Sequence, residues 1–348
     1  MPYSFFLGAN SSRGFHSFYN ELINPEDAKA IYILKGCPGC GKSSLMKKVA
    51  SAAESSGYEV EYIHCSSDPA SLDGIIIPKL QKAIVDGTFP HIVEPSFPLA
   101  VEQYIDLGQF ADIHSIRASK AEIIELKEKH ASYFKHIYRF TSCAGAVDNE
   151  LFDIAISSSA VDKLHKKAQR IISNEIPKNK GFAKSKKRFL SAISPDGYIT
   201  LSIKDNLKTY VLEDTFGLSH FLLSPILHTA EESGYDCIAC FNPLIPERLE
   251  HLFIPSLNLS FLSKGNCKDE IKSCFKKIRI DSLIDVSKDE KKRINALKRA
   301  KSDILDLSYS LLHEAKIVHD ELENLYNPHI DFDSLYLSAN KFISEFME

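Results

Sequence analysis

The stretch GCPGCGKSS, residues 36–44, matches the pattern G-x-x-x-x-G-K-[ST] at every fixed position. It is preceded by AIYILK, residues 30–35, a short apolar run with β-branched residues that is typical of a buried parallel strand. It leads into SSLMKKVASAAES, residues 43–55, whose apolar residues recur on one face of a helix. Strand, glycine-rich turn and helix in this order predict an α/β unit with a phosphate-binding loop.

Each residue type in this loop has a physical reason. Glycines adopt positive φ and let backbone N–H groups approach phosphate oxygens, because no Cβ stands in the way. The N-terminus of the following helix adds N–H groups and the positive end of the helix dipole. Lys42 is expected to reach the β and γ phosphates, and Ser43 to ligate Mg²⁺. ATP and Mg²⁺ are therefore the expected cofactors, and the predicted binding residues are Gly36, Cys37, Pro38, Gly39, Cys40, Gly41, Lys42, Ser43 and Ser44.

Cys37 and Cys40 also form a C-x-x-C pair, which leaves a redox role open. We interpret them as non-glycine spacers of the loop. Reversible oxidative inhibition of ATP binding is a side hypothesis, because a helix N-terminus lowers the pKa of a thiol. A four-cysteine zinc site with Cys237 and Cys240 is not expected, since the second pair lies in an expected strand, where residues three apart point to opposite faces.

Three aspartates are candidates for catalytic roles. Asp86 follows the apolar residues of KAIVDGTFPH, and phosphoryl-transfer sites of this class place a metal-orienting carboxylate after such a strand. We therefore assign it to Mg²⁺ together with Ser43, although Asp-Gly is also a strong turn signal. Asp68 and Asp73 lie in HCSSDPASLDG after another expected strand, where they could position water or a substrate hydroxyl. For Asp68, capping of the following turn is an equal alternative.

The chain also contains an internal repeat. FLGANSSRGF at residues 6–15 recurs as FLSAISPDGY at residues 189–198, and residues 54–80 recur at residues 231–257. Between these blocks, the phosphate-loop segment is matched by YVLEDTFGLSHFLL. Three blocks in the same order with nearly constant spacing indicate a duplicated α/β unit.

The second copy of the loop lacks the residues that carry the chemistry. Aligned on its central glycine, it has Asp214 at the first glycine, His220 at the lysine and Phe221 at the serine. Ser263 takes the place of Asp86. The second copy is therefore not expected to bind a triphosphate in the same manner.

Apolar periodicity predicts a helical hairpin after each α/β core. In the first half, its turn is expected at TSCAGAVDN, residues 141–149. Residues 176–188 contain Pro, Gly and an excess of basic residues, and are expected to form a solvated linker rather than a nucleic-acid contact. The predicted organisation is two tandem P-loop-like α/β units, at residues 1–175 and 189–348, joined by this basic linker.

Composition limits the class of protein. The 348 residues, 44% hydrophobic and 25% charged, are typical of folded proteins and sufficient for two domains. A net charge of -4 argues against a protein that coats nucleic acid or membrane surfaces. No window reaches the length of a membrane span and the N-terminus is unlike a signal peptide, so a cytoplasmic protein without a membrane partner is expected. A protein partner or a homo-oligomer stays open.

The first half resembles the P-loop NTPase superfamily. The longer pattern, YILKGCPGCGKSSLMKK followed by HCSSDPASLDGIIIP and IVDGTFPH, is similar to a little-characterised family of bacterial ATPases built from two tandem P-loop units. The resemblance implies the phosphate and magnesium roles described above, and a phosphate loop in each half, from which this chain departs. We therefore expect Mg²⁺-dependent ATP hydrolysis at one site, with a structural or regulatory second half. The alternatives are a small-molecule or nucleotide kinase, and a nucleotide-sensing scaffold with little turnover.

Overall fold

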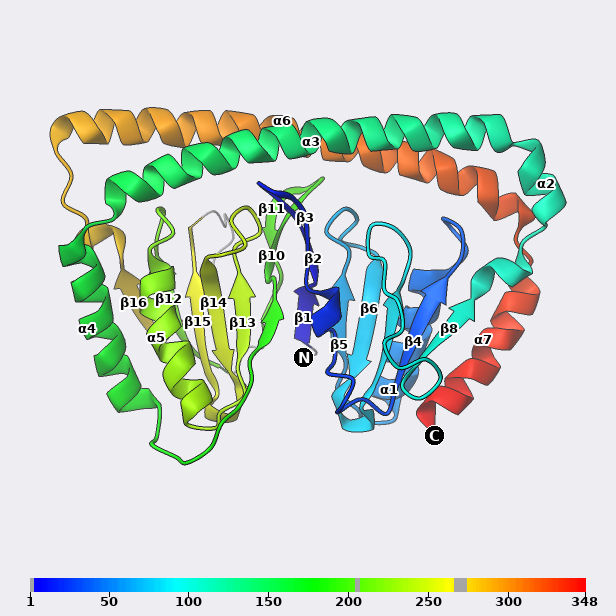
Figure 1. Ribbon diagram of the computed structural model, residues 1–348, viewed down its shortest axis with the longest axis horizontal. Helices are drawn as coiled ribbons and strands as arrows, with labels where there is room; N and C mark the ends of the chain where they lie inside the picture. Colours follow the sequence, from blue (N-terminus) through cyan, green and yellow to red (C-terminus); the bar gives the residue numbers. More distant parts are fainter. Residues whose placement is uncertain (1–2, 204–206, 266–273) are drawn as a thin grey trace. The chain divides into compact units, whose positions relative to one another are not determined.

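The predicted strand AIYILK forms β4, inside the first of two six-stranded mixed sheets (Figure 1). The computed structural model describes residues 3–203, 207–265 and 274–348. In the first sheet, β4 is parallel to β7 and β8, so the carboxyl ends of these three strands meet at one edge. In sheet order, the strands are β1 (Tyr3–Phe6), β5 (Glu61–His64), β6 (Leu72–Ile77), β7 (Lys82–Asp86), β4 (Ala30–Lys35) and β8 (Glu102–Asp106).

The second sheet repeats this arrangement. β12 is parallel to β15 and β16, and β14 is antiparallel to both neighbours, as β6 is in the first sheet. The order is β9 (Lys186–Arg188), β13 (Ile238–Phe241), β14 (Leu249–Ile254), β15 (Leu259–Ser263), β12 (Lys208–Glu213) and β16 (Lys276–Arg279). Two hairpins accompany the sheets: β2 (Gly8–Ser11) with β3 (Gly14–Ser17), and β10 (Ser191–Ser194) with β11 (Gly197–Thr200). The predicted α/β class is confirmed.

The chain divides into two compact units that are interleaved along the sequence. The first, called here the N-sheet unit, contains the first sheet and comprises Ser17–Ile137 and Tyr309–Glu348 together with β1. The second, the C-sheet unit, contains the second sheet and comprises Ala9–His16 and Tyr138–Ser308. This division differs from the expected boundary at residues 176–188.

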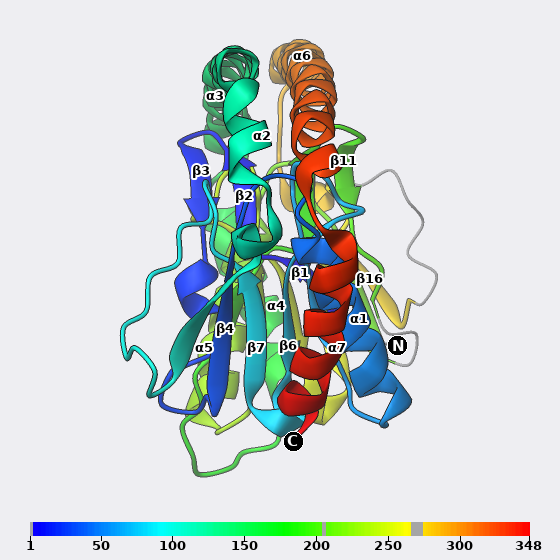
Figure 2. The same ribbon diagram turned by 90° about the vertical axis from the view of Figure 1, so that its right-hand side faces the viewer.

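The reason for the difference lies in helix packing. In the N-sheet unit, α7 (Phe332–Met347) packs on α1 (Lys42–Ser55), as Figure 2 shows. In the C-sheet unit, α4 (Ser158–Glu175) packs on α5 (Ser219–Glu232). Each sheet is thus covered partly by a helix that follows the other sheet in the sequence, because burial of an apolar stripe depends on complementary surface and not on sequence distance.

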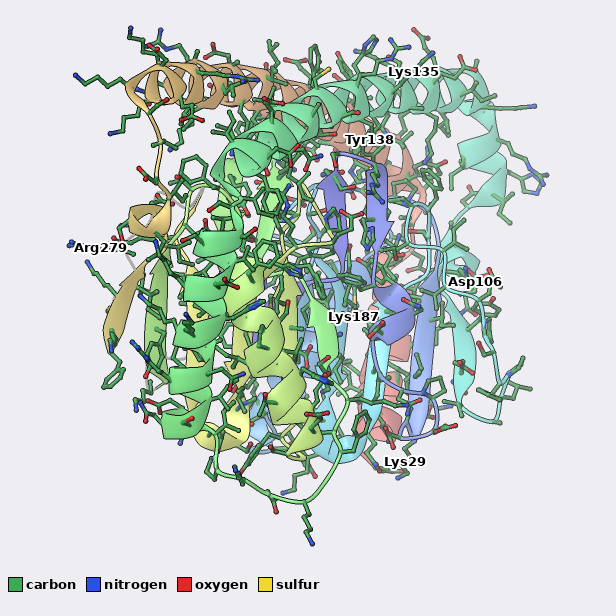
Figure 3. The ribbon with its side chains drawn as sticks, turned by 60° about the vertical axis from the view of Figure 1, so that its left-hand side comes forward. Lys29, Asp106, Lys135, Tyr138, Lys187 and Arg279 are labelled. Carbon is green, nitrogen blue, oxygen red and sulfur yellow. The ribbon has the colours of Figure 1, made fainter. Side chains whose placement is uncertain are left out.

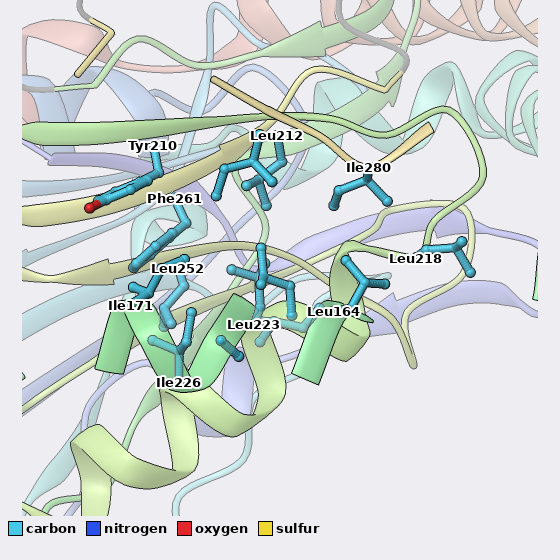
Figure 4. Packing of buried hydrophobic residues seen from close by; sticks show 14 of the residues in the cluster. Leu164, Ile171, Tyr210, Leu212, Leu218, Leu223, Ile226, Leu252, Phe261 and Ile280 are labelled. Atoms are coloured by element: carbon cyan, nitrogen blue, oxygen red, sulfur yellow. The ribbon is translucent and has the colours of Figure 1, made fainter. Parts of the chain in front are cut away.

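The core of the C-sheet unit forms between its sheet and these two helices. Leu212 and Phe261 of the sheet pack with Leu223 of α5 and Leu164 of α4 (Figure 4). The N-sheet core is built in the same way from α1 and α7, with Met46 and Phe346 fully buried. Burial of these apolar side chains is the main favourable contribution to the free energy of folding of both units.

The turn expected at residues 141–149 is wrong, since the segment lies inside α3 (Lys120–Ala155). Gly145 permits close packing: a Cβ there would overlap the side chain of Ser12 and lie 3.4 Å from Ile245. Thr141 continues the helix while its hydroxyl donates to the carbonyl oxygen of Ser11, at 2.8 Å. Gly145 therefore serves close packing of a continuous helix rather than a turn.

The remaining elements include α6 (Lys288–Tyr326), which is followed directly by a short 3-10 helix. The others are α2 (Ile113–Ala118) and the short 3-10 helices η1 (Tyr19–Glu21), η2 (Pro78–Leu80), η3 (Leu107–Phe110), η4 (Pro255–Leu257), η5 (Asp281–Leu283) and η6 (Asn327–His329). Among the described residues, no helix combines the length and the apolar character needed to cross a membrane.

The sequence predicts a solvated linker at residues 176–188, but only part of this segment is a linker. Its last three residues form β9, which pairs in parallel with β13, and Lys187 lies on this strand (Figure 3). The side chain of Arg188 is fully buried. The segment therefore ends as an edge strand of the second sheet.

Candidate functional site

The glycine loop connects the carboxyl end of β4 to the start of α1. Gly36, Gly39 and Gly41 have φ values of 152°, 73° and 84°, which residues with a Cβ rarely adopt. α1 begins at Lys42, and no side chain among the described residues caps its N-terminus. The first N–H groups of the helix and its positive dipole end therefore remain suited to an anion.

Lys42 and Asp86 lie together beside this loop. Lys42 Nζ donates a hydrogen bond to the carbonyl oxygen of Cys37, at 3.0 Å. The same Nζ lies 3.8 Å from Asp86 Oδ2, and the two side chains are only 12% and 14% exposed. A predicted cation and a predicted carboxylate, 44 positions apart in the sequence, are thus brought to one place.

The position of Asp86 follows from the sheet. It is the last residue of β7 and is in register with Leu34 of β4. Asp86 Oδ1 accepts hydrogen bonds from Thr88 N at 2.8 Å and from Thr88 Oγ1 at 2.7 Å. One carboxylate oxygen of Asp86 therefore holds the turn at Thr88, and the other lies beside Lys42.

Ser43 points to the neighbouring strand β6. Its Oγ accepts a hydrogen bond from the backbone N–H of Leu72, at 3.0 Å. The hydroxyl keeps its own hydrogen and a second lone pair for another partner. Ser44, the next residue, is exposed, and Pro38 is partly buried.

The two loop cysteines have different environments. Cys40 is buried below the loop, where a Cβ on Gly36 would lie 2.6 Å from its Sγ. Hydrogen bonding from Cys40 and the charge of Lys42 lower the pKa of the Cys37 thiol to about 7. The hydrogen bond with Cys37 and burial raise the pKa of Cys40. Cys37 is therefore the more reactive thiol at neutral pH.

The tip of α6 lies over the loop, a feature that sequence reasoning missed. A Cβ on Gly39 would overlap Asn327 Oδ1 and lie 3.3 Å from Glu323 Cβ. Asn327 Oδ1 is buried without a hydrogen-bond partner among the described residues. No local signal could have revealed this contact, because the two segments are almost 300 positions apart.

Asp68 and Asp73 do not join Lys42. Asp68 accepts a hydrogen bond from Ser71 Oγ at 2.6 Å and closes a turn, which fits the capping alternative. Asp73 is a buried residue of β6 whose Oδ2 accepts from Tyr19 OH at 2.6 Å and lies 3.2 Å from His91 Nε2. Burial raises the pKa of Asp73. Sequence reasoning missed Tyr19 and His91.

The matching loop of the C-sheet unit, residues 214–218, is one residue shorter than residues 36–41, since β12 ends at Glu213 and α5 begins at Ser219. The expected alignment of His220 with Lys42 is therefore shifted by one. His220 Nδ1 accepts from Leu249 N at 3.3 Å, as Ser43 Oγ accepts from the corresponding residue of β6.

An aspartate fills this second loop. Asp214 Oδ1 accepts from Phe216 N at 3.1 Å, and its Oδ2 accepts from Ser219 N at 2.5 Å. Burial raises the pKa of Asp214, against the opposing effect of these N–H donors. The carboxylate of Asp214 thus lies inside the turn and accepts hydrogen bonds from the loop and from the start of α5.

Comparisons of this chain with protein-family models, with curated proteins and with solved structures found no match.

Proposed function

We propose that the N-sheet unit is a P-loop NTPase that hydrolyses ATP with Mg²⁺, and that the C-sheet unit has a structural or regulatory role. The observation that carries this proposal is the approach of Lys42 Nζ to Asp86 Oδ2, 3.8 Å apart, at the uncapped start of α1. A lysine at the start of this helix, beside a carboxylate at the end of β7, matches the requirements of phosphoryl transfer.

The chain's own groups can be given roles in this reaction. The loop N–H groups and the start of α1 would hold the phosphates. Lys42 would exchange its bond with the Cys37 carbonyl for phosphate oxygens, and would stabilise the charge that develops in the transition state. Ser43 and Asp86 would hold Mg²⁺, which, when bound, neutralises charge on the phosphate oxygens.

The C-sheet unit is not proposed to bind ATP in this way. The carboxylate of Asp214 already accepts the N–H groups that a phosphate would need, and Ser219 stands at the position of Lys42. A triphosphate there would meet the negative charge of Asp214, and the ammonium group of Lys298 beside the loop already donates to Thr215 Oγ1, at 3.0 Å.

A kinase is the second candidate. It is favoured by Asn327 of the N-sheet unit, whose Oδ1 lies over Gly39 and has no hydrogen-bond partner among the described residues, so that it could bind an acceptor. A nucleotide-sensing scaffold is disfavoured, because Asp86 lies beside Lys42 rather than remote from the loop.

The test is ATP binding and phosphate release, with and without Mg²⁺. Lys42→Ala should weaken ATP binding by about 1.5 to 3 kcal/mol, roughly 10- to 150-fold, because a hydrogen-bonded charge is lost. Asp86→Asn should keep Mg²⁺-free ATP binding and lower phosphate release by about 100-fold. Lys42→Arg keeps the charge and separates loss of charge from loss of fold.

The control is His220→Ala in the first turn of α5, at the position that corresponds to Ser43, which should change neither quantity. Equal losses in Lys42→Ala and His220→Ala would contradict a single site. ATP binding without phosphate release, followed by release or transfer only with an added acceptor, would favour the kinase.

A further inference from the structure

Three side chains with different ligand atoms converge inside the N-sheet unit. The ligand atoms of Cys65, Asp73 and His91 all lie within 4.8 Å of one another. Asp73 and His91 are 6% and 7% exposed. A thiol, a carboxylate and an imidazole at this separation can contact one cation, whose bonds to such ligands are about 2.0 to 2.3 Å long.

The fold brings these residues together from three segments. Cys65 follows β5, and its N–H donates to the carbonyl oxygen of Ser71 at 3.1 Å, just before β6. Asp73 lies on β6, the antiparallel neighbour of β5. The N–H of His91 donates to the carbonyl oxygen of Thr88 at 2.8 Å, in the turn after β7. Backbone hydrogen bonds thus preorganise the three positions.

Tyr19 supports the carboxylate of this cluster. Its hydroxyl donates to Asp73 Oδ2 at 2.6 Å, and its ring lies 4.6 Å from the imidazole ring of His91, centroid to centroid. Metal ligands commonly have such partners, which fix the orientation of the ligating group.

The C-sheet unit provides an internal comparison. At the repeat positions of Cys65 and Asp73 it has Asn242 and Glu250. Asn242 Nδ2 donates to Glu250 Oε1 at 3.1 Å, and Tyr198 OH donates to the same oxygen at 2.9 Å. There a buried carboxylate is contacted by an amide, a phenol and the imidazole of His251, whose Nε2 lies 3.3 Å from Glu250 Oε2. In the N-sheet unit the amide is replaced by a thiol, a weak hydrogen-bond donor but a strong zinc ligand.

We propose that Cys65, Asp73 and His91 bind one Zn²⁺ ion, with Tyr19 orienting the carboxylate. The donor set favours zinc over magnesium, because Mg²⁺ prefers oxygen ligands and soft sulfur selects zinc among common cations. Three protein ligands leave the fourth tetrahedral position for water or a substrate atom. This site is distinct from Ser43 and Asp86, and it does not depend on ATP hydrolysis.

The two proposed sites are neighbours along β6. Leu72, whose N–H bonds to Ser43 Oγ, directly precedes Asp73. A metal at Asp73 would therefore hold the start of β6 and, through it, the serine of the phosphate loop.

The experiment measures zinc in the full-length protein. Reduced, chelator-treated protein is titrated with Zn²⁺, and bound metal is quantified by mass spectrometry after desalting. We expect one equivalent per chain in the wild type. Cys65→Ser, Asp73→Asn and His91→Gln should lose it, and Tyr19→Phe should bind about 10-fold more weakly. Cys143→Ser, an exposed cysteine of α3, is the control and should keep it.

A second measurement uses only the wild type, so that misfolding of a variant does not affect it. Co²⁺ is added in place of Zn²⁺, and the visible spectrum should show tetrahedral coordination with a charge-transfer band from a single thiolate. Absence of bound zinc in the wild type would overturn the proposal. So would loss of the metal in Cys37→Ser/Cys40→Ser with retention in Cys65→Ser, or a cobalt spectrum with no thiolate or with two.

Discussion

At the scale of single residues, the side chains of the glycine loop and of the start of α1 make contacts that hold the loop itself. Ser43 accepts a backbone hydrogen bond from β6, and Lys42 bonds to the carbonyl oxygen of Cys37. Cys40 fills the space below Gly36, and Cys37 receives its hydrogen bond. The cysteines that the sequence left open between spacer and redox roles are therefore packing residues with one activated thiol.

The reactivity of Cys37 gives a prediction with a defined pH range. Because its pKa is lowered to about 7, the thiolate should predominate above that pH and disappear below it. The rate of alkylation by iodoacetamide, followed on the loop peptide by mass spectrometry, should reach half its maximum near pH 7. In Cys40→Ala the midpoint should move upward, toward about 8.5, the ordinary value.

Bound ATP should protect Cys37 if the loop holds phosphate. Cys143, exposed on α3, serves as the internal reference for reagent access. An unchanged midpoint in Cys40→Ala would show that the hydrogen bond between the two thiols does not set the reactivity.

At the scale of elements, the two loops of the repeat differ in what accepts the first N–H groups of the helix that follows. Both follow the strand that is second from one edge of its sheet and lead into a helix, and both contain a glycine at positive φ, Gly39 or Gly217. The first leaves the start of its helix without a side-chain cap, whereas the second directs the carboxylate of Asp214 at the N–H of Ser219. The second loop therefore has an internal acceptor for these N–H groups, where the proposed site in the first loop would use an external anion.

Asp214→Ala tests this interpretation. Removal of a buried acceptor leaves N–H groups unsatisfied and should destabilise the β12–α5 segment by about 1 to 3 kcal/mol. Sulfate should restore part of this loss, because it can accept the same N–H groups. Hydrogen exchange of peptides covering β12 and α5, with and without sulfate, provides the measurement.

The control is Asp236→Ala, an exposed aspartate of the same unit, which should respond to sulfate no more than the wild type does. Equal protection in Asp214→Ala and wild type, without sulfate, would mean that the carboxylate contributes nothing to the loop.

At the scale of the whole molecule, the two units are interleaved in sequence. The N-sheet core includes Leu335, Ala339 and Phe346 of the last helix, more than 250 positions after the glycine loop. Phe346 is fully buried and packs with Tyr32 of β4 and with Phe342. Stability of the candidate site therefore depends on the last residues of the chain.

Phe346→Ala should destabilise the N-sheet unit by about 3 to 5 kcal/mol, the usual cost of a cavity left by a buried phenylalanine. Since a chain with two units need not unfold in one step, peptide-resolved hydrogen exchange is the suitable measurement. Protection should fall in β4 and α1 and stay unchanged in β12 and α5. Leu337→Ala, on an exposed face of the same helix, should have little effect. A loss of protection from hydrogen exchange that is confined to α7 would contradict the packing of α7 on α1 and β4.

The sequence by itself determined what depends on neighbouring residues: the strand, glycine loop and helix around Lys42, the duplicated strand pattern, and the end of β7 at Asp86. Glycine backbone freedom and side-chain periodicity act over a few residues, so these features can be read locally. Only the tertiary structure decided which helix covers which sheet, that Asn327 lies on Gly39, and that Cys65, Asp73 and His91 meet. These contacts join segments far apart in the sequence, so they are decided by packing, and no local pattern carries the information.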